Sequence, residues 1–412
     1  MRLLHTSDWH LGQTLHDFER DYEHDHFLDW LLNTLETEQV EALLIAGDIF
    51  DNANPSAAAQ KQFYGFLTAA KRRVPHLNIV IIAGNHDSSG RLEAPDSLFV
   101  AFDTTVIGHT RRHGEIDLNR LVTPLKNRAG DIAAWGLAIP FLRPGDVPVV
   151  ETDGDRYLKG VELLYRQALD QALSRREPGQ AIIALGHCHM SGGQTSADSE
   201  RRLVIGGAEA LPVDIFDPVI AYAALGHLHR AQKVGGQSRV RYCGSPLPMS
   251  FTEIHYPHQV IRIDLDGESV AEITPIPIPR FVELLQIPAD PAPIDVVLEL
   301  LGKLNLPDAP FNARPYLEVQ VLLTGPEPGL VAKIDAALDG KPVRRAKIKT
   351  TYRTTAHSET GQGPHSLDDL GRLQPDDIFR KLHRSRFGGE PAAELLAVFS
   401  ELVREADTEA VP

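Results

Sequence analysis

The sequence predicts an α/β protein in which two sheets pack against each other and helices cover their outer faces. Two observations lead to this prediction. Five short apolar runs each stop at a glycine or a polar residue, as strands buried on both faces do. Helix-like and strand-like segments alternate early in the chain, whereas strand-like runs dominate later. We therefore expect a four-layer α/β/β/α arrangement.

Apolar residues at helical spacing predict three helices in the first part of the chain, around residues 27–35, 63–70 and 92–102. Asn54-Pro55 is a typical start for the second helix. Short strands with turns are expected over residues 104–140, and a helix over about 157–173. Further strands are expected around residues 182, 203, 221, 240 and 260, with turns at Gly206-Gly207 and Gly235-Gly236.

A proline-spaced segment, residues 274–279, predicts a linker after a first domain at residues 1–274. Alternating strand and helix patterns predict a small α+β domain at residues 280–353. Residues 354–365 are interpreted as a second linker. Two short helices are expected in residues 366–408, starting at Pro375 and Pro391. Because each is too short to be stable alone, we expect them to dock on a partner or on the rest of the protein.

Composition and charge narrow the classes of protein. The 412 residues carry a formal net charge of -15, which argues against a protein that coats nucleic acid through bulk positive charge. A nuclease is not excluded, because carboxylates that hold divalent cations count as negative in a sequence. Two cysteines, Cys188 and Cys243, favour reduced thiols. We find no signal peptide and no apolar span of membrane length, so we expect a cytoplasmic protein without a membrane partner.

Side chains that can bind metals follow five of the apolar runs. Such positions lie at the carboxyl ends of the predicted strands, where α/β proteins bind ligands. Oxygen and imidazole donors without thiolates suit Mn²⁺, Fe, Zn²⁺ or Mg²⁺. In Asp-x-His and His-x-His, residues two apart on an extended chain point to the same side, so each pair can aim at one centre. The candidate ligands are Asp8, His10, Asp48, Asn85, His187, His227 and His229, with Asp48 as the expected bridge between two cations.

A pair of cations held in this way suits phosphodiester hydrolysis, because it activates a water and neutralises phosphate oxygens. His86 is placed to protonate the leaving oxygen or to steady the developing charge. Each residue alone could be a polar strand-end residue bonded to backbone, and Asn85 could be a turn residue. Their occurrence as an ordered set favours metal binding and catalysis.

The series Asp8-x-His10, Gly47-Asp48-x-x-Asp51, Gly84-Asn85-His86-Asp87, Gly186-His187 and Gly226-His227-x-His229 resembles the five-block signature of the calcineurin-like metallophosphoesterases. Residues 5–12, 140–144 and 242–246 resemble, more narrowly, the SbcD family of bacterial nuclease subunits, counterparts of the archaeal and eukaryotic meiotic-recombination nucleases. The resemblance implies a metallophosphoesterase sandwich with a capping domain and C-terminal helices. It also implies an Mn-dependent DNA nuclease, with double-strand exonuclease and single-strand or hairpin endonuclease activity, in DNA end processing, replication, repair and recombination.

Carried over residue by residue, the resemblance implies that Asp8, His10, Asp48 and His229 hold one metal. Asp48, Asn85, His187 and His227 would hold the other, with His86 catalytic. The working ion would be Mn²⁺, although Mg²⁺ or another divalent metal could serve. The resemblance further implies a homodimer through the helices after Asn54 and near Leu98, within a heterotetramer whose SbcC-like coiled-coil ATPase is gripped by the C-terminal helices. The chain has no Gly-x-x-x-x-Gly-Lys-Ser/Thr motif, so any ATP dependence would come from that partner.

Several alternatives stay open. His189 also belongs to a Gly-His-x-His pattern, but the later block fits the closing position better, so His189 is expected to be a bystander. Archaeal members carry a histidine where Asp51 stands, and no role is assigned to Asp51. Arg143 and Arg230 could contact DNA phosphate or only water. The alternative function is a phosphatase or phosphodiesterase of the same superfamily acting on a smaller substrate, although Asn52 follows Asp51 where protein phosphatases usually have arginine.

Overall fold

The computed structural model describes residues 1–100, 102–196, 210–352, 375–392, 395–396 and 398–399. The chain divides into two compact units. The first contains Met1–Glu283 together with Pro310–Ala313, and the second contains Leu284–Ala309 and Arg314–Pro412. Among the described residues, no helix combines the length and the apolar character needed to cross a membrane.

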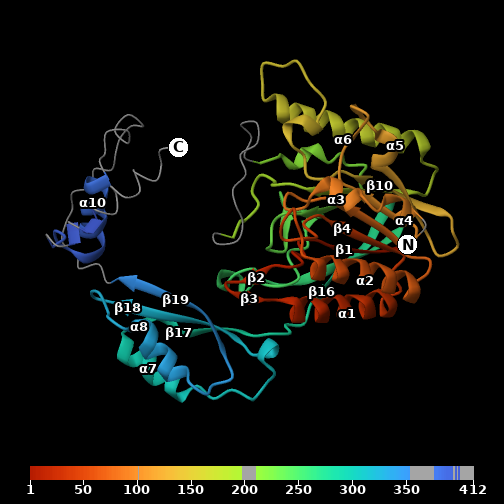
Figure 1. The fold of residues 1–412 in the computed structure, drawn as a ribbon. Coiled ribbons are helices and arrows are strands. Elements are labelled where there is room, and N and C mark those ends of the chain that lie inside the picture. Colours follow the sequence, from red (N-terminus) through yellow and green to blue (C-terminus); the bar gives the residue numbers. More distant parts are fainter. Residues whose placement is uncertain (101, 197–209, 353–374, 393–394, 397, 400–412) are drawn as a thin grey trace. The chain divides into compact units, whose positions relative to one another are not determined.

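The first sheet of the larger unit has six strands in the order β16-β15-β1-β4-β5-β6 (Figure 1). The pairs from β1 through β6 are parallel, whereas β15 runs antiparallel to both β1 and β16. The carboxyl ends of the parallel strands β1, β4 and β5 therefore lie side by side at the same end of the sheet. The strands are β1 (Arg2–Thr6), β4 (Ala42–Ala46), β5 (Asn78–Ile82), β6 (Thr104–Ile107), β15 (Gln259–Asp266) and β16 (Ser269–Pro277).

The second sheet also has six strands, in the order β13-β14-β12-β11-β10-β9. Its four central strands, from β14 to β10, are parallel to one another, whereas the outermost strands β13 and β9 are each antiparallel to their neighbour. The strands are β9 (Val122–Lys126), β10 (Ile132–Ala138), β11 (Ala181–His187), β12 (Tyr222–Gly226), β13 (Gln232–Val234) and β14 (Gln237–Tyr242). Two further hairpins join β2 (Thr14–Leu15) to β3 (Phe18–Glu19), and β7 (Arg111–Arg112) to β8 (Glu115–Ile116).

Strand β4 shows how the layers arise. Leu44 and Ala46 pack into the core shared with the second sheet, whereas Leu43 and Ile45 pack with Phe27 of α1. Because successive side chains of a strand point to opposite faces, an uninterrupted apolar run is needed to fill both cores. Helices α1 (Asp21–Thr37) and α2 (Ala57–Arg73) cover the first sheet, and α5 (Leu118–Leu121) and α6 (Arg156–Arg175) cover the second (Figure 1). The predicted four-layer arrangement is confirmed.

Two segments differ from the expectation. The single helix expected over residues 92–102 is split into α3 (Ser89–Glu93) and α4 (Asp96–Val100). Pro95 lies between them, where it has no N–H to continue α3 and its carbonyl accepts from the N–H of Phe99 at 3.1 Å to begin α4.

Residues 274–277 of the proline-spaced segment expected to be a linker form the last part of β16, an edge strand paired with β15. Pro275 pairs with Ile261, and Pro277 pairs with Gln259. Residues two apart in a strand direct their backbone nitrogens to the same side, so alternate prolines can all face away from the neighbouring strand. Proline is tolerated at a sheet edge for this reason, and the prediction of a linker is wrong for residues 274–277.

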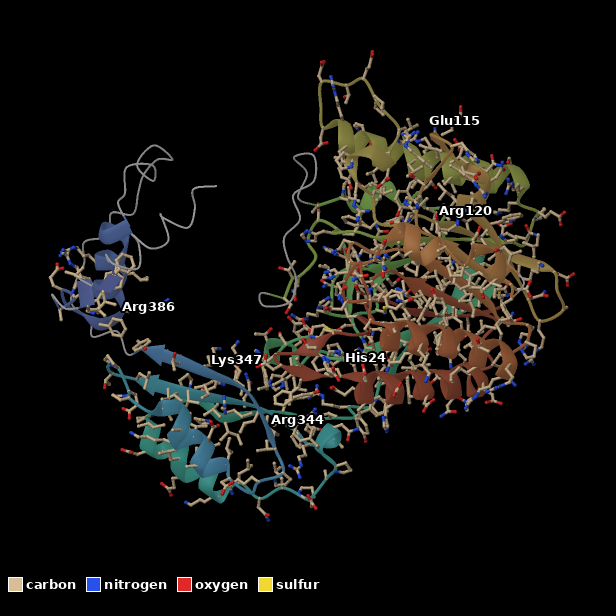
Figure 2. The ribbon with its side chains drawn as sticks, in the orientation of Figure 1. His24, Glu115, Arg120, Arg344, Lys347 and Arg386 are labelled. Atoms are coloured by element: carbon tan, nitrogen blue, oxygen red, sulfur yellow. The ribbon has the colours of Figure 1, made fainter. Side chains whose placement is uncertain are left out.

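The second unit contains a three-stranded parallel sheet, β17-β18-β19. Leu317 and Val319 of β18 pack with Val297 and Leu301 of α7, and the opposite face carries Glu318, 3.8 Å from Lys347. Figure 2 labels Arg344 and Lys347, both on β19. The elements are β17 (Leu284–Ala292), α7 (Ile294–Lys303), β18 (Tyr316–Leu323), α8 (Leu330–Leu338), β19 (Arg344–Tyr352) and α10 (Pro375–Phe387).

Helix α10 begins at the predicted proline and ends before Gly388, whose φ of 75° suits a residue without a side chain. The turn at Gly235-Gly236 between β13 and β14 is confirmed. The strand expected around Leu203, the Gly206-Gly207 turn and the linker at 354–365 lie outside the described residues. The same holds for most of the helix expected after Pro391.

Candidate metal centre

The candidate ligands lie at the carboxyl ends of five strands that belong to the two facing sheets. Asp8 and His10 follow β1, Asp48 follows β4, and Asn85 follows β5. His187 is the last residue of β11, and His227 and His229 follow β12. The structure brings all seven of these side chains, and His86, into one buried or half-buried cluster.

One part of the cluster is formed by Asp8, His10 and His229, whose ligand atoms lie within 4.8 Å of one another. His10 Nε2 is 3.8 Å from Asp48 Oδ2. This Nε2 atom is buried, and no described residue offers it a hydrogen bond. A buried polar nitrogen without a partner is costly unless another group occupies its lone pair, so these donors fit a bound cation.

The other part is formed around Asn85, whose Oδ1 lies 3.0 Å from His187 Nε2 and 3.0 Å from His227 Nδ1. His187 Nε2 is also 3.3 Å from Asp48 Oδ2. Asp48 therefore lies between both groups of donors, as a carboxylate that bridges two cations must. Carboxylate, amide and imidazole donors without thiolates fit Mn²⁺, Fe, Zn²⁺ or Mg²⁺.

The backbone at this centre departs from the extended form expected for the Asp-x-His and His-x-His pairs. Asp8, His10 and Asp48 have φ values of 54°, 47° and 50°, and His227 has a φ of 106°. Residues other than glycine adopt these angles rarely, and at a cost that surrounding structure must offset. As a result, His227 turns toward Asn85 while His229 turns toward His10. We expected both histidines of the His-x-His pair to face the same cation position. For His227 and His229 this expectation is wrong, because the two side chains face different groups of donors.

Glycines allow the loops to approach closely. A Cβ on Gly84 would lie 2.1 Å from Asp48 Oδ1, and a Cβ on Gly47 would lie 2.3 Å from His187 Nδ1. The Asp87 carboxylate then ties the two loops together by accepting from the N–H groups of Gly84, Ile49 and Phe50 at 2.8, 3.2 and 3.0 Å. These bonds fix Asp48 relative to Asn85.

Charges around Asp48 set its protonation state. Burial alone would raise the pKa of Asp48, but the imidazoles of His187, His10 and His86 hold that pKa well below its usual value. Burial alone would likewise lower the pKa of His187, which the Asp48 carboxylate raises to about 9. Burial and then the charge of Asp48 raise the pKa of Asp87 to about 6. Asp48 is therefore the carboxylate that stays ionised and available to a cation.

His86 lies beside the cluster and is half-buried. Its Nδ1 donates to the Asp51 carbonyl oxygen at 2.7 Å, and its backbone N–H donates to Asp48 Oδ1 at 2.8 Å. The bond to Asp51 orients the ring and leaves Nε2 available for proton transfer. A ligand atom of His86 also lies within 4.8 Å of those of His10 and Asp48, so the geometry is compatible with a metal ligand as well.

Two arginines lie near this centre. The Arg143 guanidinium stacks 5.4 Å from the Phe141 ring centroid, and that ring meets His187 edge-on at 6.2 Å. Arg230 follows His229 and stacks 5.4 Å from the ring of Tyr256. The ring centroid of His189 lies 6.3 Å from that of His227.

Sequence reasoning missed the residues behind the ligands. Glu253 accepts from His229 Nδ1 at 3.1 Å, and Asp51 Oδ1 lies 3.5 Å from His10 Nδ1. Asp51 belongs to a recognised block, but nothing in the sequence around Glu253, in the short 3₁₀ turn Phe251–Glu253, marks a contact with the centre.

Comparison with known proteins agrees with this fold. Residues 1–231 match the calcineurin-like phosphoesterase family, and residues 280–386 match the family described as the type 5 capsule protein repressor C-terminal domain. The chain belongs to the calcineurin-like phosphoesterase family.

Its curated relatives carry a more specific name. The chain is 41% identical to the SbcD subunit of the nuclease SbcCD from Rhodobacter capsulatus, over 92% of this chain and 93% of that protein. It is 31% identical to the SbcD subunit from Escherichia coli K12, over 92% of each chain. It is 36% identical to the Bacillus subtilis protein of the same name, over 64% of this chain and 66% of that protein. The recognition of an SbcD-type chain is confirmed.

Proposed function

We propose that this protein is the nuclease subunit of an SbcCD-like complex, a two-metal phosphodiesterase that cuts DNA. Its substrates would be double-stranded ends, cut exonucleolytically, and single strands or hairpins, cut endonucleolytically. The observation that carries the proposal is the convergence of six candidate ligand side chains on Asp48, with His86 beside them. The proposed setting is cytoplasmic DNA end processing in repair, recombination and replication.

In this proposal Asp8, His10, Asp48 and His229 hold one cation, and Asp48, Asn85, His187 and His227 hold the other. A bound pair of divalent cations, proposed to be Mn²⁺, lowers the pKa of a water and neutralises phosphate charge. The chain supplies the remaining elements. Asp87 fixes the relation between the Asp48 and Asn85 loops. His86, whose Nδ1–H is held by the Asp51 carbonyl, would deliver a proton to the leaving oxygen from Nε2 as an imidazolium protonated at both nitrogens, and would become a neutral imidazole.

The substrate is tested with purified full-length protein, Mn²⁺, end-labelled duplex, hairpin DNA and a phosphomonoester. We expect DNA cleavage that requires the cation and is lost with a chelator. Preferential hydrolysis of the monoester, with DNA uncut even after an SbcC-like ATPase is added, would favour the phosphatase alternative. Repeating the assay with Mg²⁺, Zn²⁺ and Fe²⁺ tests the choice of Mn²⁺.

The partners are proposed from exposed apolar side chains. Leu98 and Phe102, which are 65% and 49% exposed, line a hollow of about 260 Å³ with Tyr64 and Leu67 of α2. We propose this surface as the homodimer contact. In the C-terminal region, Leu382 and Val398 are 48% and 54% exposed, which supports a helical segment that binds the ATPase coiled coil. Deleting residues 366–412 should abolish co-purification with the ATPase while two cations stay bound; retained complex formation would contradict this assignment.

A further inference from the structure

Glu253 is a buried carboxylate beside a proposed metal ligand. It is 0% exposed, and its Oε1 accepts from His229 Nδ1 at 3.1 Å. A carboxylate can only accept hydrogen bonds, so the proton of the His229 imidazole must lie on Nδ1. The second nitrogen, Nε2, then carries no proton and is the atom that can bind a cation.

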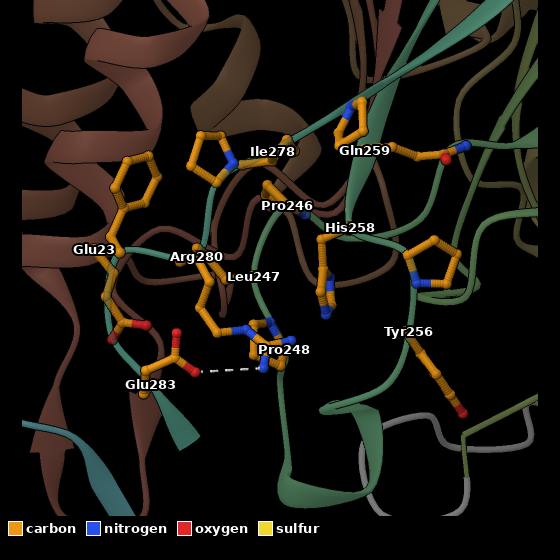
Figure 3. A pocket seen from close by; sticks show the side chains of 14 residues that line it. Glu23, Pro246, Leu247, Pro248, Tyr256, His258, Gln259, Ile278, Arg280 and Glu283 are labelled. Carbon is orange, nitrogen blue, oxygen red and sulfur yellow. Dashed lines mark ion pairs between the residues drawn. The ribbon is translucent and has the colours of Figure 1, made fainter. Parts of the chain in front are cut away.

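The carboxylate is itself fixed on two sides. Oε2 accepts from the backbone N–H of Met249 at 2.7 Å, so each oxygen of Glu253 has its own donor. His258 Nδ1 lies 2.9 Å from the Ser245 carbonyl and its Nε2 lies 3.3 Å from the Glu253 carbonyl, and a neutral imidazole donates to only one of the two. His258 lines a pocket of about 330 Å³ next to Pro246 and Arg280 (Figure 3). The carboxylate of Glu253 is thus held by the Met249 N–H as well as by His229.

The two cation positions differ in what lies behind their histidines. The Nδ1 atom of His229 bonds the carboxylate of Glu253. The Nδ1 atom of His10 lies 3.5 Å from Oδ1 of the Asp51 carboxylate. Behind His187 is the neutral Ala46 carbonyl, at 2.8 Å from Nδ1. Among the direct donors, the neutral Asn85 is near the second position, whereas Asp8 lies within 4.8 Å of His10 and His229 and also of Asp48 and His187, so its charge acts on both positions. Anionic outer partners make an imidazole a stronger ligand and add to the attraction of a cation.

We propose that Glu253 is a positioning residue for the metal centre, which sets the tautomer of His229 and makes the Asp8–His10–His229 position the tighter of the two. This inference rests on the proposed metal-binding role of His229. It does not depend on DNA being the substrate. Glutamine cannot replace Glu253, because its single oxygen can serve either His229 or Met249, and its NH₂ group would present a donor to the other.

The test is Glu253→Gln in the full chain, with Mn²⁺ and Co²⁺ as probes. We expect the affinity for the first equivalent of Mn²⁺, measured by calorimetry, to fall roughly 10- to 100-fold, as is usual when an outer partner of a ligand is removed. The second equivalent should change less. The visible absorption of the first Co²⁺ equivalent should also change, which is a readout independent of activity. Glu253→Asp, which keeps the charge, should restore part of the affinity.

Glu93→Gln is the matched control, because Glu93 also bonds a histidine, with Oε2 3.0 Å from His109 Nδ1, outside the centre. It should leave both cation affinities unchanged. An unchanged first affinity and Co²⁺ spectrum in Glu253→Gln would overturn the proposal. Should that variant fail to fold, ¹⁵N spectra of metal-free wild type decide: a proton on His229 Nδ1 supports the proposal, and a proton on Nε2 overturns it. Failure of the proposed nuclease function would give a different result: the wild-type protein would bind two cations and still not cut DNA.

Discussion

At the scale of single residues, Asp48 is confined by close contacts with its neighbours. It has a left-handed backbone, the chain at Gly84 passes close to its carboxylate, and His86 N–H bonds Oδ1 at 2.8 Å. The position of this one carboxyl group therefore depends on small residues nearby as well as on the ligands themselves.

Replacing Gly84 by alanine tests that dependence. The new Cβ would lie 2.1 Å from Asp48 Oδ1, closer than any real contact, so Asp48 must move. We expect fewer than two Mn²⁺ bound per chain by elemental analysis, and nuclease activity reduced by about 10²-fold or more. Gly65→Ala in α2 is the control, since its Cβ would meet nothing within 4 Å. Two bound cations and full activity in Gly84→Ala would show that the site tolerates displacement of Asp48.

The role of His86 is tested by His86→Ala. If its Nε2 donates a proton to the leaving oxygen, the rate of DNA cleavage should fall by roughly 10²- to 10⁴-fold while bound Mn²⁺ stays near the wild-type amount. A leaving group that needs no proton, such as p-nitrophenolate, should lose less rate. Parallel loss of a cation would instead identify His86 as a ligand, which its distance from His10 and Asp48 allows.

At the scale of elements, His5 links the two sheets beneath the metal centre. From β1 its Nε2 donates to the Leu225 carbonyl at 3.2 Å, and its Nδ1 accepts from the Tyr222 hydroxyl at 3.0 Å, both in β12. This bond pattern requires a neutral imidazole. Burial lowers the pKa of His5 to about 3, despite the Leu225 bond that raises it.

The lowered pKa makes the link sensitive to acid. Below the unfolded-state pKa of about 6.5, the unfolded chain binds a proton that the folded chain excludes, so stability falls as the pH falls. Between pH 7 and pH 5, His5 should account for roughly 2 kcal/mol of lost unfolding free energy. Urea unfolding of the metal-free protein at pH 7 and pH 5 measures this loss of unfolding free energy. The variant His5→Gln does not titrate, so its unfolding free energy should fall by correspondingly less between the two pH values. An equal loss in both proteins would contradict the neutral link.

The sequence was sufficient to predict most of the strands and the clustering of the candidate ligand side chains, for a physical reason. Strands such as β4 must be apolar on both faces, and the ligands must follow them directly, so both features are local and readable. Glu253 and Asp87 were not predicted in their roles, because a hydrogen bond to a residue far away in the sequence leaves no local pattern. The prolines of β16 led to the wrong prediction of a linker, because proline is excluded only from central strands and β16 lies at the edge of its sheet.

At the scale of the whole molecule, the two sheets supply different halves of the centre. The first sheet contributes Asp8, His10, Asp48 and Asn85, and the second contributes His187, His227 and His229. The centre therefore forms only when the sandwich is closed, and cation binding should stabilise the larger unit against unfolding.

The proposed dimer surface is tested by Leu98→Glu. Placing a charge in the hollow lined by Leu98, Phe102 and Tyr64 removes apolar burial and adds a desolvation cost, so the wild-type dimer should become a monomer in analytical ultracentrifugation. Bound Mn²⁺ should not change. Val149→Glu, at a side chain that is 92% exposed outside this hollow, is the control. A monomeric wild type, or a dimeric Leu98→Glu, would place the contact elsewhere.

Anomalous diffraction from crystals of the Mn²⁺-loaded protein measures the central claim most directly. Two peaks should appear on either side of the Asp48 carboxylate, one contacting Asp8, His10 and His229 and the other contacting Asn85, His187 and His227. A single ion, or ions bound away from Asp48, would contradict the two-cation account and the nuclease chemistry derived from it.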